Sequence, residues 1–321
     1  MKRSNPADKL AKKKQTWIKR TAQILAIDEA AAEALLATGR SQSIRLNPLT
    51  GEIAQTYAAL QAMGWSGEQY SWMPEGYTIT SNAKELRDSS LVANGRVFIQ
   101  NAASWLPVLA LDPQPDDAVL DVCAAPGGKT SHIAAVTGNK ALITANDNSR
   151  PRLAKLRANL DRLGTRIQRY TLYDATTLAR KLDGQQFDRI LIDAPCSGEG
   201  LMNINHDKDF ASWSVAHIKR LQQLQKRILT QSWQLLKPGG TLVYSTCTMA
   251  PEENEAVIDY LLRSREDVEI IPVELRLPNR VPTVAAWNGK QYATELEGCL
   301  RLQPSEHIEA FFVCKLKKRI L

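Results

Sequence analysis

The stretch AVLDVCAAPGGKT (118–130) decides the fold. Its first residues form an almost unbroken apolar run, which is typical of a strand buried on both faces. Gly127 and Gly128 then make a turn into a helix. ALITAND (141–147) repeats the strand, and Pro151 is well placed to open the helix that follows it. Repeated strand–helix units of this kind predict an α/β fold with a doubly wound parallel sheet.

Further segments downstream continue the same pattern. A helix with apolar residues at helical spacing, Ile218 to Leu235, is expected to stop at KPGG (237–240). FFVCKLK (311–317) is expected to supply a late antiparallel strand. The other strands of the sheet are predicted at RIQRYTLYD (166–174), FDRILIDA (187–194) and TLVYSTC (241–247).

The composition of the 321 residues narrows the class of protein. With 44% hydrophobic and 23% charged residues and no apolar run of ~18 residues, it excludes a membrane span and a wholly disordered chain. Five cysteines without a CxxC pair and four scattered histidines predict neither a disulfide framework nor a zinc site. No apolar stretch with a small-residue cleavage site follows the N-terminal charges, so we expect a cytoplasmic protein.

The excess positive charge is concentrated near the N-terminus. Residues 1–20 carry eight Lys or Arg and the single acidic residue Asp8, which accounts for the whole formal charge of +7. We interpret this segment as a basic tail, which could bind phosphates or merely keep the chain soluble. Residues 21–105 mix helical and turn-like stretches and predict a small α+β module, and residues 106–321 hold the predicted sheet.

The loop after the first strand, CAAPGGKT (123–130), is neither GxGxxG nor GxxxxGKS, so a pyrophosphate is not the obvious ligand. Its amides at the helix start could instead hold a carboxylate. Asp147 stands twenty residues past Gly127, a separation at which an acid commonly binds ribose hydroxyls. Asp174 and Asp193 end later strands; each acid alone could be a helix cap, but three at one rim favour a pocket. A nucleoside with an amino acid end and no phosphates describes S-adenosylmethionine.

Two cysteines, Cys196 in LIDAPCSGEG and Cys247 in YSTCTMAPEENEA, directly follow predicted core strands at the same rim. Carbon 5 of cytosine is too electron-poor to accept a methyl group unaided, and a thiolate added at carbon 6 makes it nucleophilic. One cysteine would therefore be the nucleophile, and Asp193 could pair with the ring during addition. Cys299 and Cys314, and also Cys123, suit buried structural thiols.

At these residues the chain resembles the RNA 5-cytosine methyltransferases of the NOL1/NOP2/Sun family, especially the bacterial small-subunit rRNA branch. The resemblance covers roughly residues 40 to 318. The matching motifs are SIRLNPL (43–49), GRVFIQNAAS (95–104), DVCAAPGGKT (121–130), DNSRPRL (147–153), DAPCSGEG (193–200), LKPGGTLVYSTCT (236–248), EENE (252–255) and EAFFVCKLKK (309–318). Asn101, Pro48 and Ala310 depart from residues common in the family.

The resemblance implies a Rossmann-like class I methyltransferase domain over residues 106–321 and an RNA-recognition role for residues 21–105. It implies Cys247 as the nucleophile and Cys196 as the residue that assists product release, with Asp193 beside them. The implied substrate is RNA, rRNA or alternatively tRNA. The residues implied to surround the donor are Cys123, Ala124, Ala125, Pro126, Gly127, Gly128, Lys129, Asp147, Arg152, Asp174 and Asp193.

Two other functions are weighed against this one. A DNA 5-cytosine methyltransferase would need Gln after the Pro-Cys pair, where this chain has Ser197, and a separate Glu-Asn-Val element. A non-catalytic ribosome-assembly factor is disfavoured by the intact loop, cysteines and acids. We expect a monomer that binds RNA and neither a membrane nor a metal.

Overall fold

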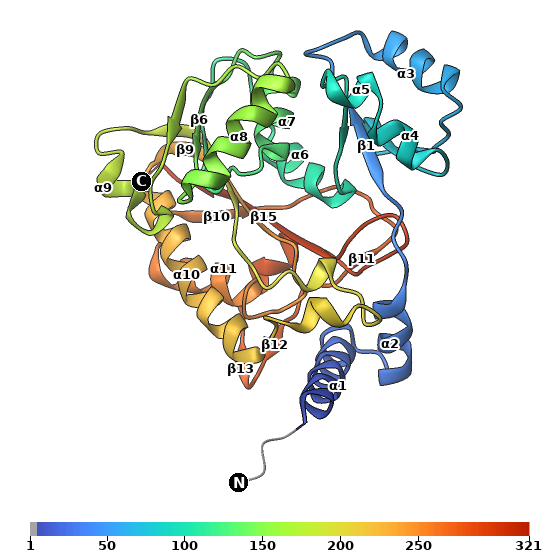
Figure 1. Ribbon diagram of the computed structural model, residues 1–321. Helices are drawn as coiled ribbons and strands as arrows, with labels where there is room; N and C mark the ends of the chain where they lie inside the picture. Colours follow the sequence, from blue (N-terminus) through green and yellow to red (C-terminus); the bar gives the residue numbers. More distant parts are fainter. Residues whose placement is uncertain (1–4, 321) are drawn as a thin grey trace.

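The computed structural model describes residues 5–320, which form a large sheet covered by helices, a smaller N-terminal sheet and a pair of N-terminal helices (Figure 1). The large sheet has the order β11-β14-β15-β9-β8-β5-β6-β7, and β10 pairs with β15. Strands β7, β6, β5, β8 and β9 are parallel neighbours, whereas β15 is antiparallel to β9. The predicted doubly wound sheet with a late antiparallel strand is thus confirmed. Its strands are β5 (Ala118–Asp121), β6 (Leu142–Asn146), β7 (Arg169–Thr171), β8 (Phe187–Asp193), β9 (Leu236–Thr246), β10 (Val268–Ile271), β11 (Arg280–Val281), β14 (Leu300–Leu302) and β15 (Phe311–Lys318).

Helices cover both faces of this sheet because alternate strand residues point to opposite sides. Leu120 and Ile190 pack in one core with α10 and α11, while Val119 and Leu191 pack in a second core with α6 and α7. Because both faces are buried, the strands read as continuous apolar runs in the sequence. The helices of this part are α6 (Leu106–Leu111), α7 (Gly128–Val136), α8 (Arg150–Arg162), α9 (Leu178–Lys181), α10 (Val215–Gln234) and α11 (Glu255–Ser264), with 3-10 turns η1 (Ala102–Trp105), η2 (Ala175–Thr177), η3 (Glu199–Leu201), η4 (Asp207–Phe210) and η5 (Thr294–Gly298).

The N-terminal sheet is antiparallel with the order β2-β3-β1-β4. Its core contains Ile44 and Leu46 from β1, Leu60 and Leu86 from the helices beside it, and Trp65 from the loop after α3. Strand β1 has the sequence SIRL, and all four of its residues are buried. The elements are β1 (Ser43–Leu46), β2 (Gln69–Tyr70), β3 (Met73–Thr78), β4 (Val97–Ile99), α3 (Ile53–Ala62), α4 (Ala83–Arg87) and α5 (Ser90–Ala93), and a separate hairpin is made by β12 (Ala286–Trp287) and β13 (Lys290–Gln291).

Helices α1 (Pro6–Leu25) and α2 (Glu29–Ala37) pack against loops of the large domain. Trp17 of α1 is fully buried, and its ring centroid lies 5.3 Å from that of Phe210. Their core also includes Trp213 and Met249, which belong to loops of the large domain. Most of the predicted basic tail is therefore helix α1, which runs without interruption through residue 20, while residues 1–4 lie outside the described part of the chain.

One local expectation is wrong. KPGG (237–240) does not stop α10, which already ends at Gln234, and these four residues belong to β9. Leu236 pairs with Phe187, so the strand begins directly after the helix. Gly239 has φ +80°, a conformation that glycine adopts without strain, and it allows an irregular start of the strand.

Candidate active site

The loop after β5 is shaped by Gly127, the residue before the first turn of α7. Its φ of +108° lies in the region that favours glycine, so a side chain here would be strained. The turn directs Lys129 across to the end of β8, where its Nζ lies 2.6 Å from Oδ2 of Asp193. Burial alone would lower the pKa of Lys129, but Asp193 and Cys247 raise it, so this side chain stays a cation.

Asp193 is held from two sides. Its Oδ1 accepts a hydrogen bond from Ser245 Oγ at 3.0 Å, and its Oδ2 is paired with Lys129. Ser245 reaches it because β8 and β9 are parallel and place these two residues opposite each other. Each carboxylate oxygen can accept a second hydrogen bond, so Asp193 can still contact a ligand.

The two other predicted acids differ in their surroundings. Asp147 is buried, pairs with Arg152 Nη2 at 3.1 Å and accepts from the Ser149 amide at 3.0 Å. Arg152 also donates to the Ala125 carbonyl, which ties the acid to the loop after β5. Asp174 is exposed and caps η2 by accepting from the Thr176 amide at 2.8 Å. The helix-cap role therefore applies to Asp174. Asp174 also lines the pocket at the carboxyl ends of the strands.

A pocket of about 390 Å³ lies along the carboxyl ends of the strands. It adjoins a second hollow of about 280 Å³, which lies between the loop after β5 and residues 98–101 and is lined by Lys129. A cavity of about 700 Å³ between residues 280 and 299 contains none of the predicted site residues. Gly127 is the one predicted residue that lines neither of these two hollows. The larger hollow is lined by Cys123, Ala125, Asp147, Arg152, Asp174, Asp193, Cys196 and Cys247. The smaller hollow is lined by Ala124, Pro126, Gly128 and Lys129.

The two cysteines at strand ends meet in this pocket. Their sulfur atoms lie 3.2 Å apart, close enough for one thiol to donate to the other. The loop that contains Cys196 is hydrogen-bonded to the loop that contains Cys247: the Gly200 amide donates to the Cys247 carbonyl at 2.9 Å. Only glycine fits there, since a Cβ on Gly200 would lie 2.1 Å from the Ala310 carbonyl oxygen. Hydrogen bonding to Cys247 and burial raise the pKa of Cys196 well above its ordinary value.

The remaining cysteines are placed differently. Cys299 and Cys314 are buried in the core that α10 and α11 cover, as expected for structural thiols. Cys123 borders both hollows at the rim, and burial raises its pKa above the ordinary range. Burial also raises the pKa of Cys299, so neither Cys123 nor Cys299 is placed to be a thiolate.

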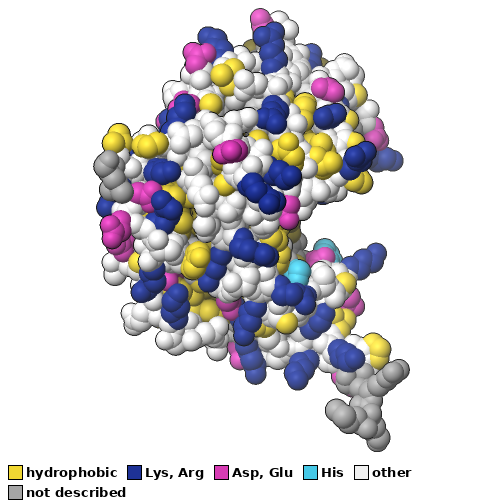
Figure 2. Space-filling model, turned by 90° about the vertical axis from the view of Figure 1, so that its left-hand side faces the viewer, with side chains coloured by type: hydrophobic (Ala, Val, Ile, Leu, Met, Phe, Trp, Pro, Cys, Tyr) yellow, Lys and Arg dark blue, Asp and Glu magenta, His cyan; other side chains and the backbone are white. Residues whose placement is uncertain are grey.

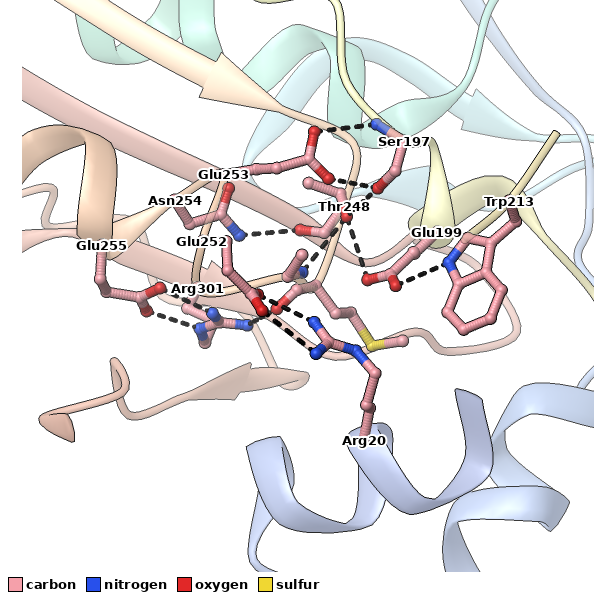
Figure 3. A network of polar contacts seen from close by, with 12 residues as sticks. Arg20, Ser197, Glu199, Trp213, Thr248, Glu252, Glu253, Asn254, Glu255 and Arg301 are labelled. Carbon is pink, nitrogen blue, oxygen red and sulfur yellow. Dashed lines mark hydrogen bonds and ion pairs between the residues drawn. The ribbon is translucent and has the colours of Figure 1, made fainter. Parts of the chain in front are cut away.

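Behind the cysteines lies a buried carboxylate network, which we define as Glu199, Glu252, Glu253 and Glu255 with their partners (Figure 3). Glu253 accepts from the Ser197 amide at 2.9 Å and from the Ser197 hydroxyl. Ser197 Oγ also lies 2.8 Å from Thr248 Oγ1, and Thr248 donates to Glu199 at 3.1 Å. Ser197 follows Cys196 and Thr248 follows Cys247, so the network connects the two cysteine loops.

Two arginines from the N-terminal part reach this region. Arg20 of α1 forms a two-pronged buried ion pair with Glu252, at 2.8 and 3.1 Å (Figure 3). Although burial would raise the pKa of Glu252, the Arg20 guanidinium lowers it. Arg40 donates to the carbonyls of Gly200 and Met202. Helix α1 and the segment that follows α2 therefore hold the two cysteine loops.

The sequence did not reveal these contacts. EENE (252–255) entered only as a matching motif, and four consecutive polar residues are usually a solvated surface. Their burial was signalled only by their place directly after a core strand and Cys247. The ion pair of Lys129 with Asp193 was also not foreseen, although both residues were in the predicted set. Arg20 and Glu252 lie 232 positions apart, and no local pattern pairs them.

Parallel strands, helices on both faces and a pocket at the carboxyl ends of the strands define a doubly wound, Rossmann-like fold with a ligand site. The comparisons identify its class as that of the class I methyltransferases. Residues 108–317 match the family model described as "16S rRNA methyltransferase RsmB/F". The chain belongs to this family, within the NOL1/NOP2/Sun methyltransferases, as its motifs predicted.

Three similar proteins show the extent of the likeness. A "tRNA (cytosine(49)-C(5))-methyltransferase" of Pyrococcus abyssi (strain GE5 / Orsay) is 38% identical over 281 residues, which cover 86% of this chain and 88% of that protein. "Ribosomal RNA small subunit methyltransferase F" of Cronobacter sakazakii (strain ATCC BAA-894) is 36% identical over 284 residues; these cover 86% of this chain but only 57% of that protein. A "Methyltransferase Homolog Protein" from Pyrococcus horikoshii superposes with a TM-score of 0.78 at 31% identity, covering 94% of this chain and 98% of that one.

Residues 5–320 lack two further features. No helix in that range is both long enough and apolar enough to span a membrane. Within the same range, no three His, Cys, Asp or Glu side chains are grouped so that they could hold a metal ion.

Proposed function

We propose that this protein transfers a methyl group from S-adenosylmethionine to carbon 5 of a cytosine in RNA, through a transient bond between Cys247 and the base. The observation that carries the proposal is the placement of two cysteine sulfurs 3.2 Å apart in a pocket lined by strand-end acids. Addition to the ring requires a nucleophile, and the later release requires a second group that assists proton transfer close to it.

The pocket residues fit the donor chemically. The carboxylate of Asp147 is fixed by Arg152 and the Ser149 amide and faces the pocket, where it would bind the ribose hydroxyls. Asp174 keeps one carboxylate oxygen outside its cap and would bind the adenine amino group. The residues Cys123 to Lys129 would surround the amino acid end. When bound, S-adenosylmethionine supplies a methyl group that is activated by a positively charged sulfur.

Cys247 would attack carbon 6 of the cytosine as a thiolate. Lys129 lies close enough to Cys247 for that cysteine to raise the pKa of the ammonium group. Asp193, held by Ser245 and Lys129, would accept hydrogen bonds from the base and stabilise charge in the ring.

Release needs a base that removes the proton from carbon 5, after which the bond between carbon 6 and Cys247 breaks. Cys196 would assist this release, because its sulfur lies 3.2 Å from that of Cys247. General acid–base help of this kind contributes ~10²–10⁴ in rate.

RNA contacts are proposed for the N-terminal module and for exposed cations. Lys9, Lys12 and Lys19 of α1 are exposed. Helix α10 contains four Lys or Arg and no acidic residue. It lies on the left in Figure 1, and Figure 2, which views the molecule from that side, shows Lys and Arg gathered over the lower half of this face. Such a surface suits a polyanion.

Replacement of each cysteine tests the chemistry. Cys247→Ala should abolish both methylation and any covalent adduct with RNA. Cys196→Ala should still attack, fail to release, and accumulate a protein–RNA complex that survives denaturant. Cys299→Ala, in the core, is the control and should keep both activities. Reversed outcomes for the first two variants would overturn the assignment.

Donor binding is tested by titration with S-adenosylmethionine. Asp147→Ala should weaken binding about 10- to 100-fold, the cost of losing a charged hydrogen bond. Asp161→Ala removes an exposed acid of α8 that does not line the pocket and should leave the affinity unchanged. Equal affinities of the two variants would exclude Asp147 from the donor site.

The substrate is proposed to be rRNA, and tRNA is the second candidate. The family model favours rRNA by its description, whereas the Pyrococcus abyssi relative, named for a tRNA cytosine, is covered over 88% of its length. Bisulfite sequencing of rRNA and tRNA from a strain that lacks the gene decides between them, because the cytosine that loses its methyl group identifies the substrate.

A further inference from the structure

Cys196 is held through both of its neighbours in the chain. Gln225 of α10 donates through Nε2 to the Pro195 carbonyl at 2.9 Å and to Glu253 Oε2 at 2.8 Å. Glu253 in turn accepts from the amide and the hydroxyl of Ser197. Gln225 and Glu253 are both fully buried, so this clamp is a built part of the interior.

The two sulfur atoms have opposite electrostatic surroundings although they touch. Cys247 lies within the field of the Lys129 ammonium. The hydrogen bond with Cys247 and burial raise the pKa of Cys196, and the charges of Glu253 and Asp193 act in the same direction. The nearby carboxylates therefore disfavour negative charge on the Cys196 sulfur.

We propose that Glu253 is a positioning residue that assigns the roles of the two cysteines: it fixes the Cys196 loop through Ser197 and keeps Cys196 a neutral thiol, so that Cys247 is the nucleophile. This inference rests on the proposed function for its catalytic meaning. Its electrostatic content concerns the protein alone and can be measured without RNA or methyl donor.

The carboxylate of Glu253 is itself sensitive to its neighbours. Its pKa is raised to about 7: burial is the largest cause and Glu199 acts in the same direction, whereas the hydrogen bonds from Ser197 and Gln225 lower it. The hydroxyl of Tyr244 on β9 donates to its backbone carbonyl, not to the carboxylate. Removing the Ser197 hydroxyl should therefore protonate Glu253 more readily and weaken its charge at Cys196.

The test is alkylation of the full chain by iodoacetamide, in which a thiolate sulfur forms the bond to carbon and iodide leaves. Rates at each cysteine are followed by peptide mass spectrometry at about pH 8, one unit above the pKa of about 7 of Glu253. Glu253→Gln keeps the size of the side chain and removes the charge. Cys196 should react about tenfold faster in this variant, equivalent to one pKa unit, while the Cys247 rate should change less than about twofold.

Two further variants make the result decisive. Ser197→Ala should raise the Cys196 rate in the same direction but by less, and it serves if Glu253→Gln does not fold. Glu266→Gln, an exposed acid beyond α11, controls for general loss of charge and should change neither rate. An unchanged ratio of the Cys196 and Cys247 rates in folded Glu253→Gln and Ser197→Ala would overturn the inference. Absence of RNA methylation by the unaltered protein, with the alkylation pattern as expected, would overturn the proposed function instead.

Discussion

The strand-end rim and the buried carboxylate network are two halves of one site that are built in different ways. The rim takes its residues from short segments directly after β5, β6, β8 and β9, so the sheet itself places them. The network joins Arg20 of α1, the Cys196 loop and the start of α11, and only tertiary packing brings these together. The reacting groups therefore lie on the half that the sheet places, whereas the geometry of the two cysteines depends on the half that tertiary packing assembles.

The largest effect is expected from breaking the remote half at Arg20. Arg20→Met leaves the buried carboxylate of Glu252 without its partner, which costs about 3–5 kcal/mol of unfolding free energy in comparable buried pairs. Urea unfolding measures this change. Because the pair braces the cysteine loops, methylation should fall in the fraction of the protein that remains folded.

Two matched variants sharpen this prediction. Lys14→Met breaks an exposed pair on the same helix, with Asp207 at 2.7 Å, and should cost only about 0–1 kcal/mol. The double replacement of Arg20 by Met and Glu252 by Met should recover much of the loss, since no buried charge is then left unpaired. A cost for Arg20→Met no larger than that for Lys14→Met would show that the network does not depend on α1.

The strand-end rim could be predicted from the sequence, whereas the buried carboxylate network could not. The strands, the turn at Gly127 and the acids at strand ends followed from local periodicity and spacing. KPGG was placed at the wrong boundary, because pairing of Leu236 with Phe187 extends β9 back to the helix end. The burial of EENE could not be predicted, since a run of polar residues becomes an interior network only through partners such as Arg20 that are distant in sequence.

A somewhat smaller effect concerns the pH dependence of stability. In the folded chain the pKa of Glu253 is raised to about 7 from an ordinary 4.5. A raised carboxyl pKa contributes stability that is fully present below the ordinary value and is lost as the pH rises through about 7. This contribution amounts to at most about 3 kcal/mol. Glu253→Gln should remove it.

The measurement is the difference in unfolding free energy between Glu253→Gln and the unaltered chain, followed from about pH 4.5 to about pH 8. The difference isolates Glu253 from other titrating groups. Asp121, with a pKa raised to about 7, acts in the same direction. His132, whose pKa burial lowers well below its ordinary value, acts in the opposite one. If the two curves stay parallel over the whole range, Glu253 titrates as in the unfolded chain and its burial has no electrostatic consequence.

The smallest effect separates the two faces of α1. Lys13 points inward, donating to the carbonyls of Phe210 at 2.6 Å and Ala211 at 3.1 Å, whereas Lys9 and Lys12 are exposed. If about four phosphates are neutralised by this segment, the logarithm of RNA affinity should fall with the logarithm of salt at a slope near −3. Replacing Lys9 and Lys12 by Gln should make the slope less steep by about 1.4, at about 0.7 for each phosphate contact to a single strand, without changing the unfolding midpoint. Lys13→Gln should do the reverse, lowering the midpoint and leaving the slope unchanged, because its charge is already used to hold α1 on the loop that precedes α10. A common effect of both changes on the slope would mean that α1 detaches from that loop when RNA binds.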